Sequence, residues 1–522
     1  MPIRLFAFGE KRLLLRQDEL SEPEILKLET GSGLGSSEPS LTSRVVRGAV
    51  WVLVGKGASR LLGFVRTVIL ARLLAPGDFG LFGIVMLAQA TLDTFTQTGF
   101  GAALIQRKAD IKGYLDTAWT VQVIRRLVLA MGVFAGAPLV GWFFVEPRAV
   151  PLLRLMSISI ALSGFVNIGI IYFRKELQFR RQVAYDVLSY AVGLVVGVFL
   201  AFRLRNVWAL VWAELAVSAS NCVLSYLLHP YRPRLHFEGA QAAELFRFGR
   251  WMLASSIVIF LATRGDSAFL GKMLGVAALG IYQVAYHIAN APATEITDVT
   301  NAVMMPTYAK LQGDKGRLGR AFLQVFEVVF TLASPLTVFI VLAAPEMVLG
   351  IFGSKWQAAI VPIEILAVSG FLVAIAATAG PVFLGTGHPH MDFWMNLCRV
   401  GTIAVCIYPL TMLFGVAGTC FSIVLGLAAT LPIWASVRGI CGLSFFAIIR
   451  SMTQGLVLAG LVIIAFLVVR LIGGGFGHLG TLAFQGAAAA SVCGVAVLIS
   501  GKWLNWGVSV FAARAWRSIR TS

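Results

Sequence analysis

The chain has 522 residues, of which 58% are hydrophobic and 13% are charged. Soluble domains average about 45–50% apolar and about 25% charged residues, so this composition excludes a water-soluble enzyme built of several polar domains. Lys and Arg outnumber Asp and Glu by 43 to 25, which gives a net charge of +18. The basic residues gather in short connectors between apolar runs. This is typical of a membrane protein with cationic cytoplasmic loops rather than of a nucleic-acid-binding protein.

The first 43 residues differ in composition from the rest of the chain. They mix basic and acidic residues, and a stretch rich in Gly and Ser follows at residues 31–40. This composition predicts a disordered cytosolic tail. We expect no cleavable signal peptide, because no basic start leads into a long apolar core.

Fourteen apolar segments follow, each long enough to cross a hydrocarbon core about 30 Å thick. Lys and Arg are concentrated at the two termini and in the connectors after even-numbered segments. The asymmetry predicts an all-α integral membrane protein with both termini in the cytoplasm. The connectors after odd-numbered segments hold only Arg72, Arg148, Arg203, Arg205, Lys272 and Lys355. The predicted segments are 47–71, 80–104, 117–143, 150–173, 183–202, 207–228, 249–271, 279–303, 321–344, 357–384, 393–414, 416–437, 448–471 and 479–501.

An internal repeat relates the two halves of the chain at an offset of 200 residues. Residues 71–74 and 79–82 resemble residues 271–274 and 279–282: in both copies a segment ends in a basic residue and a glycine opens the next one. Matched halves are a common basis of alternating access in transporters. The repeat predicts two pseudo-symmetric six-helix lobes and two extra C-terminal helices. The expected parts are a tail (1–43), an N-lobe (44–229), a cytoplasmic connector (230–248), a C-lobe (249–440), two further helices (441–501) and a basic cytosolic tail (502–522).

Charged residues inside the first segment indicate a binding surface for an anion. A charge in a membrane-spanning helix costs about 2.5–3.5 kcal/mol, so it is expected to face a partner or a wet cavity. Lys56, Arg60 and Arg66 fit within an arc of about 120° over about 15 Å of helix. The seventh segment holds Arg264 and Asp266, and Asp266 occupies the repeat position of Arg66. A salt bridge between Arg66 and Asp266, or between Arg264 and another acid, is the structural alternative.

Other charges lie in predicted segments without an assigned role. Asp93 and Asp298 occupy segments paired by the repeat, and they are candidates for coupling to a proton or cation, or for helix packing. We expect Arg125 and Arg126 to reach the cytoplasmic interface. The remaining charges are Arg154, Asp186, Glu214, Glu327, Glu364 and Arg399.

Several chemistries lack the motifs that they require. The six cysteines form no CxxC pair, which disfavours a disulfide framework or zinc site. His388 and His390 lie in a connector without nearby carboxylates, so we expect no metal site. No nucleotide-binding GxxxxGK[ST], HExxH or GxSxG motif is present. We therefore predict a transporter without a cofactor and not an enzyme. A membrane glycosyltransferase or polysaccharide polymerase remains the less favoured alternative, because the external connectors are short.

Six short stretches along the chain form a recognisable set of motifs. They are Ser-Arg-Leu-Leu-Gly-Phe-Val-Arg (59–66), Ile-Leu-Ala-Arg-Leu-Leu-Ala-Pro-Gly-Asp-Phe-Gly (69–80), Thr-Gly-Phe-Gly-Ala-Ala-Leu-Ile-Gln-Arg (98–107), Leu-Gly-Ile-Tyr (279–282), Ala-Pro (291–292) and Met-Pro (305–306). These motifs resemble the polysaccharide-transporter flippases of lipopolysaccharide and exopolysaccharide biosynthesis. That family is part of the multidrug/oligosaccharidyl-lipid/polysaccharide exporter superfamily, and the likeness extends over about residues 45–440.

The resemblance implies a V-shaped bundle in the bacterial inner membrane. It implies that the protein moves undecaprenyl-diphosphate-linked O-antigen or exopolysaccharide repeat units to the outer leaflet by alternating access. Lys56, Arg60, Arg66 and Arg264 would then hold the diphosphate, because guanidinium groups bind phosphate oxygens bidentately. Energy would come from a proton, a sodium ion, the membrane potential or consumption of the cargo. The expected partners are this lipid-linked oligosaccharide, membrane lipids, and a polysaccharide polymerase with a chain-length regulator; nucleic acid is not expected.

Two relatives in the same superfamily give alternative functions. Arg60 and Arg66 also match the first helix of lipid II flippases, but Thr67 stands where an acid commonly follows the second arginine. Multidrug exporters bind cations through acids in their cavity, whereas the first segment here offers only bases. Lipid II transport and drug–cation antiport are therefore the second and third hypotheses.

Overall fold

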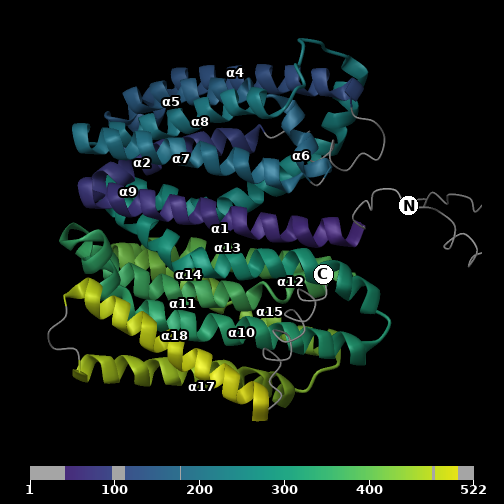
Figure 1. The fold of residues 1–522 in the computed structure, drawn as a ribbon, viewed down its shortest axis with the longest axis vertical. Helices are drawn as coiled ribbons and strands as arrows, with labels where there is room; N and C mark the ends of the chain where they lie inside the picture. Colours follow the sequence, from purple (N-terminus) through teal and green to yellow (C-terminus); the bar gives the residue numbers. More distant parts are fainter. Residues whose placement is uncertain (1–40, 97–111, 177, 473–476, 504–522) are drawn as a thin grey trace, which may run out of the picture. The chain divides into compact units, whose positions relative to one another are not determined.

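The computed structural model describes residues 41–96, 112–176, 178–472 and 477–503, and within this part of the chain the regular structure is entirely helical (Figure 1). The predicted all-α fold is confirmed. The α-helices are α1 (Leu41–Leu73), α2 (Pro76–Phe95), α4 (Lys112–Phe143), α5 (Ala149–Gly164), α6 (Ile171–Lys175), α7 (Phe179–Leu204), α8 (Trp208–Leu228), α9 (Gly239–Leu311), α10 (Lys315–Glu346), α11 (Ile360–Ala376), α12 (Gly380–Gly385), α13 (Pro389–Phe414), α14 (Val416–Ala428), α15 (Leu431–Ala435), α16 (Val437–Cys441), α17 (Phe445–Ile472) and α18 (His478–Trp503).

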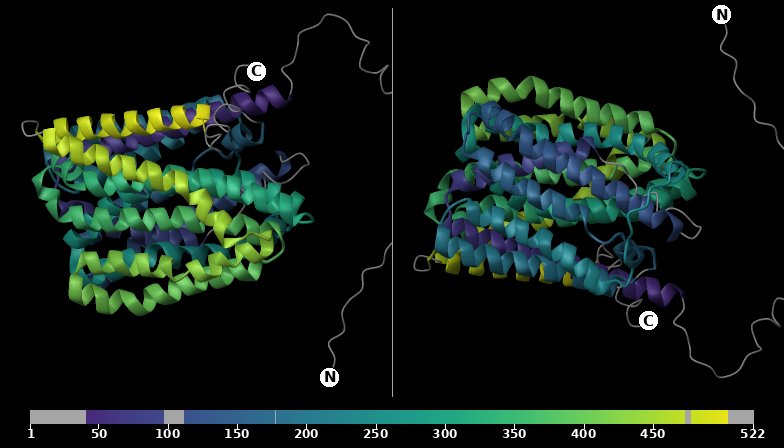
Figure 2. Two further views of the ribbon diagram at one scale, coloured as in Figure 1. Left: turned by 90° about the horizontal axis from the view of Figure 1, so that it is seen from below. Right: turned by 90° about the horizontal axis from the view of Figure 1, so that it is seen from above.

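The helices of the unit that starts at Arg47 pack in two groups (Figures 1 and 2). The first group packs α2, α4, α5, α7 and α8 together, and the second packs α10, α11, α13, α14, α17 and α18. Helix α9 contacts both groups, through α2 on one side and α11 on the other. Helix α1 packs with the first group, since Leu70 clusters with Ala201 and Leu210. In the structure we call the first group with α1 the N-lobe. We call the second group, which also includes the two helices beyond the predicted C-lobe, the C-lobe.

The described residues of each of the fourteen predicted segments are mostly helical, and residues 97–104 of the second segment lie outside the described residues. Ten stretches are long and apolar enough, by length and composition, to cross a membrane within the described part of the chain. Helices α1, α2 and α5 fall outside that set. Basic residues interrupt the apolar character of α1, and α5 ends at Gly164 after 16 residues. The chain is thus an all-α, multi-pass membrane protein.

The predicted segment at 150–173 is broken in the middle. Helix α5 ends at Gly164, and a short 3-10 turn, Ile168–Ile170, then leads into α6. Asn167 is fully buried at the break: its side chain accepts a hydrogen bond from Gly169 N and donates one to Tyr231 O. The amide oxygen pairs a backbone N–H at the break, and the amide nitrogen ties the break to the segment after α8.

Helix α9 joins two predicted segments that we expected to be separated by a loop. It begins at Gly239, inside the predicted connector 230–248, and it bends at Gly275. Gly275 has φ 80° and ψ −174°, a conformation that side-chain-bearing residues rarely adopt. A single glycine therefore changes the chain direction in the second half. At the matching position of the first half, Ala75 separates α1 from α2, which begins at Pro76.

Residues of the internal repeat meet where α1 ends and α2 begins, at the left in Figure 1. A methyl group built on Gly80 would overlap the carbonyl oxygen of Val276 and lie 2.9 Å from Gly280 N. A methyl group on Gly280 would in turn overlap the carbonyl oxygen of Pro76. Helix α2 and the second part of α9 thus touch backbone to backbone at matching positions of the two halves. We call this region the closed end.

Two basic side chains, also at matching positions, join the lobes at the closed end. Arg72 donates from Nε to the carbonyl oxygen of Ile351 at 2.7 Å and from Nη2 to that of Gly350. Lys272 donates from Nζ to the carbonyl oxygen of Phe143. Each half thus contributes one basic side chain that binds backbone carbonyl oxygens of the other half. Lys272 binds Phe143 at the end of α4, and Arg72 binds Gly350 and Ile351 between α10 and α11.

A tryptophan completes the contact between the lobes. Trp356 is fully buried, and its indole Nε1 donates to the carbonyl oxygen of Ala71 at 2.8 Å. Its ring packs edge-on against Phe79, with ring centroids 5.1 Å apart. The closed end therefore combines close backbone packing, a buried aromatic contact and three inter-lobe donors.

Candidate functional site

Two arginines, one from each half of the chain, lie beside one histidine on α9. Arg60 on α1, Arg264 on α9 and His287 on α9 all have exposed side chains. The charges of Arg60 and Arg264 both lie within electrostatic range of the His287 imidazole. Arg60 is twelve residues before Arg72, so it lies about 18 Å from the closed end along α1. Two of the four predicted anion-binding residues thus act electrostatically on the same histidine, and their role in binding stays a prediction.

Arg66 is held inside the N-lobe. Its Nη2 lies 3.9 Å from Glu214 Oε2 on α8, with side-chain exposures of 21% and 30%. Gly193 on α7 borders this guanidinium, since a methyl group there would lie 3.5 Å from Arg66 Nη1. Among the ion pairs of the described residues, Arg66 is therefore matched with Glu214 and not with Asp266. The acid that it meets comes from the sixth segment, which the repeat pattern does not reveal.

Asp266 belongs to a hydrogen-bonded cluster in the C-lobe. Its Oδ2 accepts a hydrogen bond from the hydroxyl of Tyr282, and its Oδ1 accepts one from Ser267 N at 2.6 Å. The side chains of Lys56 and Asp298 lie outside the described residues. Their proposed parts in anion binding and in coupling therefore stay predictions.

Asp93 on α2 pairs with two adjacent arginines of α4. Its Oδ1 lies 2.9 Å from Arg125 Nη1 and 3.1 Å from Arg126 Nη1. Arg125 also donates to the hydroxyl of Thr96 at 3.3 Å. The two arginine side chains are about four-fifths buried. We expected both to extend to the cytoplasmic interface, and that expectation stays a prediction.

Replacing Asp93 by Asn is expected to destabilise the protein by about 2 kcal/mol, since two neighbouring guanidinium groups would lose their counter-charge. The value lies between those of exposed and buried ion pairs because the Asp93 side chain is 40% exposed. The thermal unfolding midpoint in detergent measures it. Arg148→Gln, which removes an exposed pair within one connector, is the control and should leave the midpoint unchanged. An equal midpoint for D93N and wild type would refute this assignment.

The C-lobe contains a cavity of about 350 Å³ next to Arg264. Its wall combines one acid, one base and hydroxyl groups with apolar and aromatic side chains, which is typical of small-molecule sites. Tyr286, in its wall, lies within electrostatic range of Arg264, Asp266 and Arg399. The lining residues are Thr263, Gly265, Asp266, Phe269, Tyr286, Ser369, Val373, Arg399, Val400, Ile403, Ala404, Ile407, Tyr408 and Ile423.

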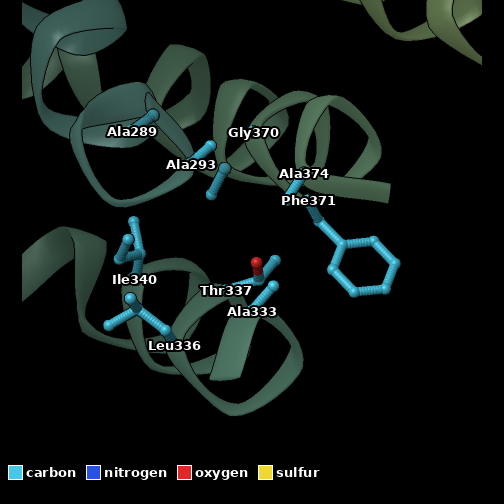
Figure 3. Close-up of a pocket in the computed structure, with 10 residues that line it drawn as sticks. Ala289, Ala293, Ala333, Leu336, Thr337, Ile340, Gly370, Phe371 and Ala374 are labelled. Atoms are coloured by element: carbon cyan, nitrogen blue, oxygen red, sulfur yellow. The ribbon is translucent and has the colours of Figure 1, made fainter. Parts of the chain in front are cut away.

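A second hollow, shown in Figure 3, is too small to bind a substrate. It measures about 10 Å³ and lies between α9, α10 and α11. Alanines and aliphatic side chains surround it, with the Thr337 hydroxyl as the polar side-chain group. It holds at most about one water molecule.

Residues with metal-binding side chains do not cluster in the described part of the chain: no group of three or more His, Cys, Asp or Glu there could hold a metal ion. The rings of His388 and His390 lie 5.9 Å apart, and His388 Nδ1 is 3.1 Å from the Thr386 hydroxyl. The six cysteines are free thiols.

Comparison with known proteins places the chain in a family. The model of a family described as polysaccharide biosynthesis protein matches residues 69–361, more than half of the chain. The chain belongs to the polysaccharide biosynthesis protein family. One relative is the lipopolysaccharide biosynthesis protein WzxC of Escherichia coli (strain K12), which is 26% identical over 366 residues, or 69% of this chain and 74% of the relative. Another is the succinoglycan biosynthesis transport protein ExoT of Rhizobium meliloti (strain 1021), which is 26% identical over 363 residues, or 69% of this chain and 73% of the relative.

Solved structures share the fold of this polysaccharide biosynthesis protein. The lipid II flippase MurJ in its inward closed conformation matches with a TM-score of 0.68 at 12% identity, covering 88% of this chain and 99% of that chain. An inward-facing multidrug resistance MATE family transporter matches with a TM-score of 0.58 at 18% identity, covering 74% and 94%. At these identities the likeness shows that the chain shares the fold of these two structures.

Sequence reasoning did not find His287 and assigned no role to Arg399. His287 is a polar residue inside an apolar segment, and this feature of the sequence could have identified it as a candidate site residue. Arg399 was recognised as a charge within a segment, but its neighbours come from α9 and α11, far away in the sequence.

Proposed function

We propose that this protein is a flippase that moves a polyprenyl-diphosphate-linked oligosaccharide across the bacterial inner membrane by alternating access. The observation that carries the proposal is that Arg60 and Arg264, one from each half of the chain, both act electrostatically on His287. A diphosphate brings negative charges into a low-dielectric region, and guanidinium groups compensate for them by bidentate hydrogen bonds. Family membership and the names of WzxC and ExoT support a glycan cargo.

Membrane orientation follows from the distribution of basic residues. The closed end holds the connectors that are poor in Lys and Arg, so we place it on the external side, with both termini in the cytoplasm. The structure would then be the state that is closed to the outside. Binding of the diphosphate between Arg60 and Arg264 draws the halves together on the cytoplasmic side and shifts the population toward the outward-open state. Flipped repeat units would be consumed outside by a polysaccharide polymerase with its chain-length regulator.

Cation antiport is the second candidate, and the acids argue against it. Asp93 and Glu214 are each paired with arginine, and Asp266 accepts two hydrogen bonds. A cation-binding site needs carboxylates whose charge is not already compensated. The charged side chains that act on His287 are the bases Arg60 and Arg264.

Transfer of a fluorescent polyprenyl-diphosphate oligosaccharide between the leaflets of proteoliposomes tests the function. We expect wild type to move the lipid and Arg60→Ala to reduce transfer to the rate of empty liposomes, because one of the two guanidinium groups for the diphosphate is lost. Arg154→Ala is the matched control: this exposed arginine packs over the Phe134 ring on the N-lobe. Folded wild-type protein that moves no such lipid would refute the proposed function. Equal transfer by R60A and wild type would refute the assigned site.

A further inference from the structure

Arg399 is a charged side chain of the C-lobe cavity that the fold itself does not satisfy. It lies on α13 and lines the cavity of about 350 Å³. Its Nε atom is buried and has no hydrogen-bond partner. A buried donor without a partner is costly, and a guanidinium in a membrane-spanning helix is more costly still. Such a group is expected where a ligand completes its hydrogen bonds.

The acid of the same cavity does not complete them. Asp266 lies within electrostatic range of Arg399, but its oxygens accept hydrogen bonds from Tyr282 and Ser267. No ion pair joins Arg399 to a carboxylate of the described residues at salt-bridge distance. Arg399 thus lines the cavity without a carboxylate at salt-bridge distance, and Asp266 keeps the net charge of the wall near zero.

The rest of the wall suits a sugar ring. Phe269, Tyr286 and Tyr408 supply aromatic surface, and Ser369 and Thr263 supply hydroxyl groups. A sugar ring has one apolar face and several hydroxyl groups. It therefore matches a cavity whose wall combines aromatic surface with a few polar groups. Tyr286 is the neighbour of His287 along α9, so the cavity is continuous in sequence with the proposed diphosphate site.

We propose that the C-lobe cavity binds an acidic sugar of the cargo and that Arg399 holds its carboxylate. The inference rests on the proposed flippase function and specifies its substrate class: a lipid-linked oligosaccharide that contains a uronic acid or another carboxylated sugar. A single carboxylate matches the single guanidinium, and a planar bidentate pair fits the fork of arginine. A diphosphate fits this cavity less well, because its two charges would lie beside Asp266 and among apolar side chains.

Two cargoes that differ in one group test the inference. The first is a fluorescent polyprenyl-diphosphate trisaccharide that ends in glucuronic acid; the second is the same lipid with that carboxyl group reduced, which makes the terminal sugar glucose. Wild type, Arg399→Gln and Arg399→Lys are compared in proteoliposomes. Arg154→Gln is the control for removing an exposed arginine elsewhere. Binding of the free acidic and reduced trisaccharides to detergent-purified protein is measured by calorimetry.

We expect Arg399→Gln to slow transfer of the acidic cargo by about 10- to 100-fold and to leave the reduced cargo unchanged, since charge-assisted hydrogen bonds to the carboxylate are lost. Arg399→Lys should keep part of the wild-type transfer rate of the acidic cargo, because it retains the positive charge. Equal loss for both cargoes, or no loss for either, would overturn the inference while leaving the flippase function intact. If wild type moves neither cargo, the proposed flippase function is refuted. The calorimetry then tests the cavity by itself: tighter binding of the acidic than of the reduced trisaccharide supports the assignment, and equal binding overturns it.

Discussion

Replacing Gly80 by alanine is expected to abolish transport, although the change adds only one methyl group. That methyl would overlap the carbonyl oxygen of Val276, and backbone cannot turn away as a side chain can. Helix α2 and the second part of α9 must therefore separate. Overpacking in close-packed structure costs about 1–3 kcal/mol, enough to depopulate the closed end by about 5- to 150-fold. A transporter that cannot close one end cannot alternate between its inward-open and outward-open states.

Transfer in proteoliposomes and the distance between spin labels at positions 75 and 277 measure the effect. We expect the label distance to increase and transfer to fall to background. Gly77 provides the matched control: it lies one turn away on α2, and a methyl group there meets no atom within 4 Å. Gly77→Ala should behave like wild type. If G80A and G77A gave the same transfer rate and label distance, the closed end would not be the moving contact.

A cross-link between positions 72 and 351 is expected to stop transport completely. Arg72 and the carbonyl of Ile351 join the lobes across the closed end, so a covalent bridge there would hold that end shut. The six native cysteines are first replaced, because all of them are free thiols. A flexible thiol-specific reagent then bridges Arg72→Cys and Ile351→Cys. Transfer should fall to background and return when a reductant cleaves the bridge.

A bridge within one connector is the control for this experiment. Glu146 and Arg148 belong to the same connector of the N-lobe, and Arg148 Nε donates to Glu146 Oε1 at 2.7 Å. Joining positions 146 and 148 restrains no inter-lobe contact and should leave transfer unchanged. Wild-type transfer by the protein bridged between 72 and 351 would show that the lobes need not separate at this end.

The positions of the helices could be predicted because long apolar runs leave few alternatives in a membrane. The segment predicted at 47–71 lies within α1, and that at 448–471 within α17. Breaks and bends were harder to predict, since single residues decide them. Asn167 ends a helix through hydrogen bonds to a distant carbonyl, and Gly275 bends α9 through a backbone conformation that composition does not reveal.

The candidate site was predicted only in part because the partners of a charge are set by tertiary structure. The rule that intramembrane charges are functional found Arg60 and Arg264, which the structure brings near one histidine. The same rule suggested Asp266 as a partner for Arg66, whereas α8 supplies Glu214. Arg399 gained meaning only when its unpartnered Nε and the wall of the cavity were seen together.

The glycine contact of the closed end also limits how far the two halves of the chain can diverge after a duplication. A side chain gained at Gly80 meets the backbone of the second half, and one gained at Gly280 meets the backbone of the first, so neither half has a smaller residue to offer in compensation. Gly63 and Gly77, which have open space around them, are under no such restriction. Among descendants of the same duplication, glycine should therefore persist at both 80 and 280 while the residues at 63 and 77 drift.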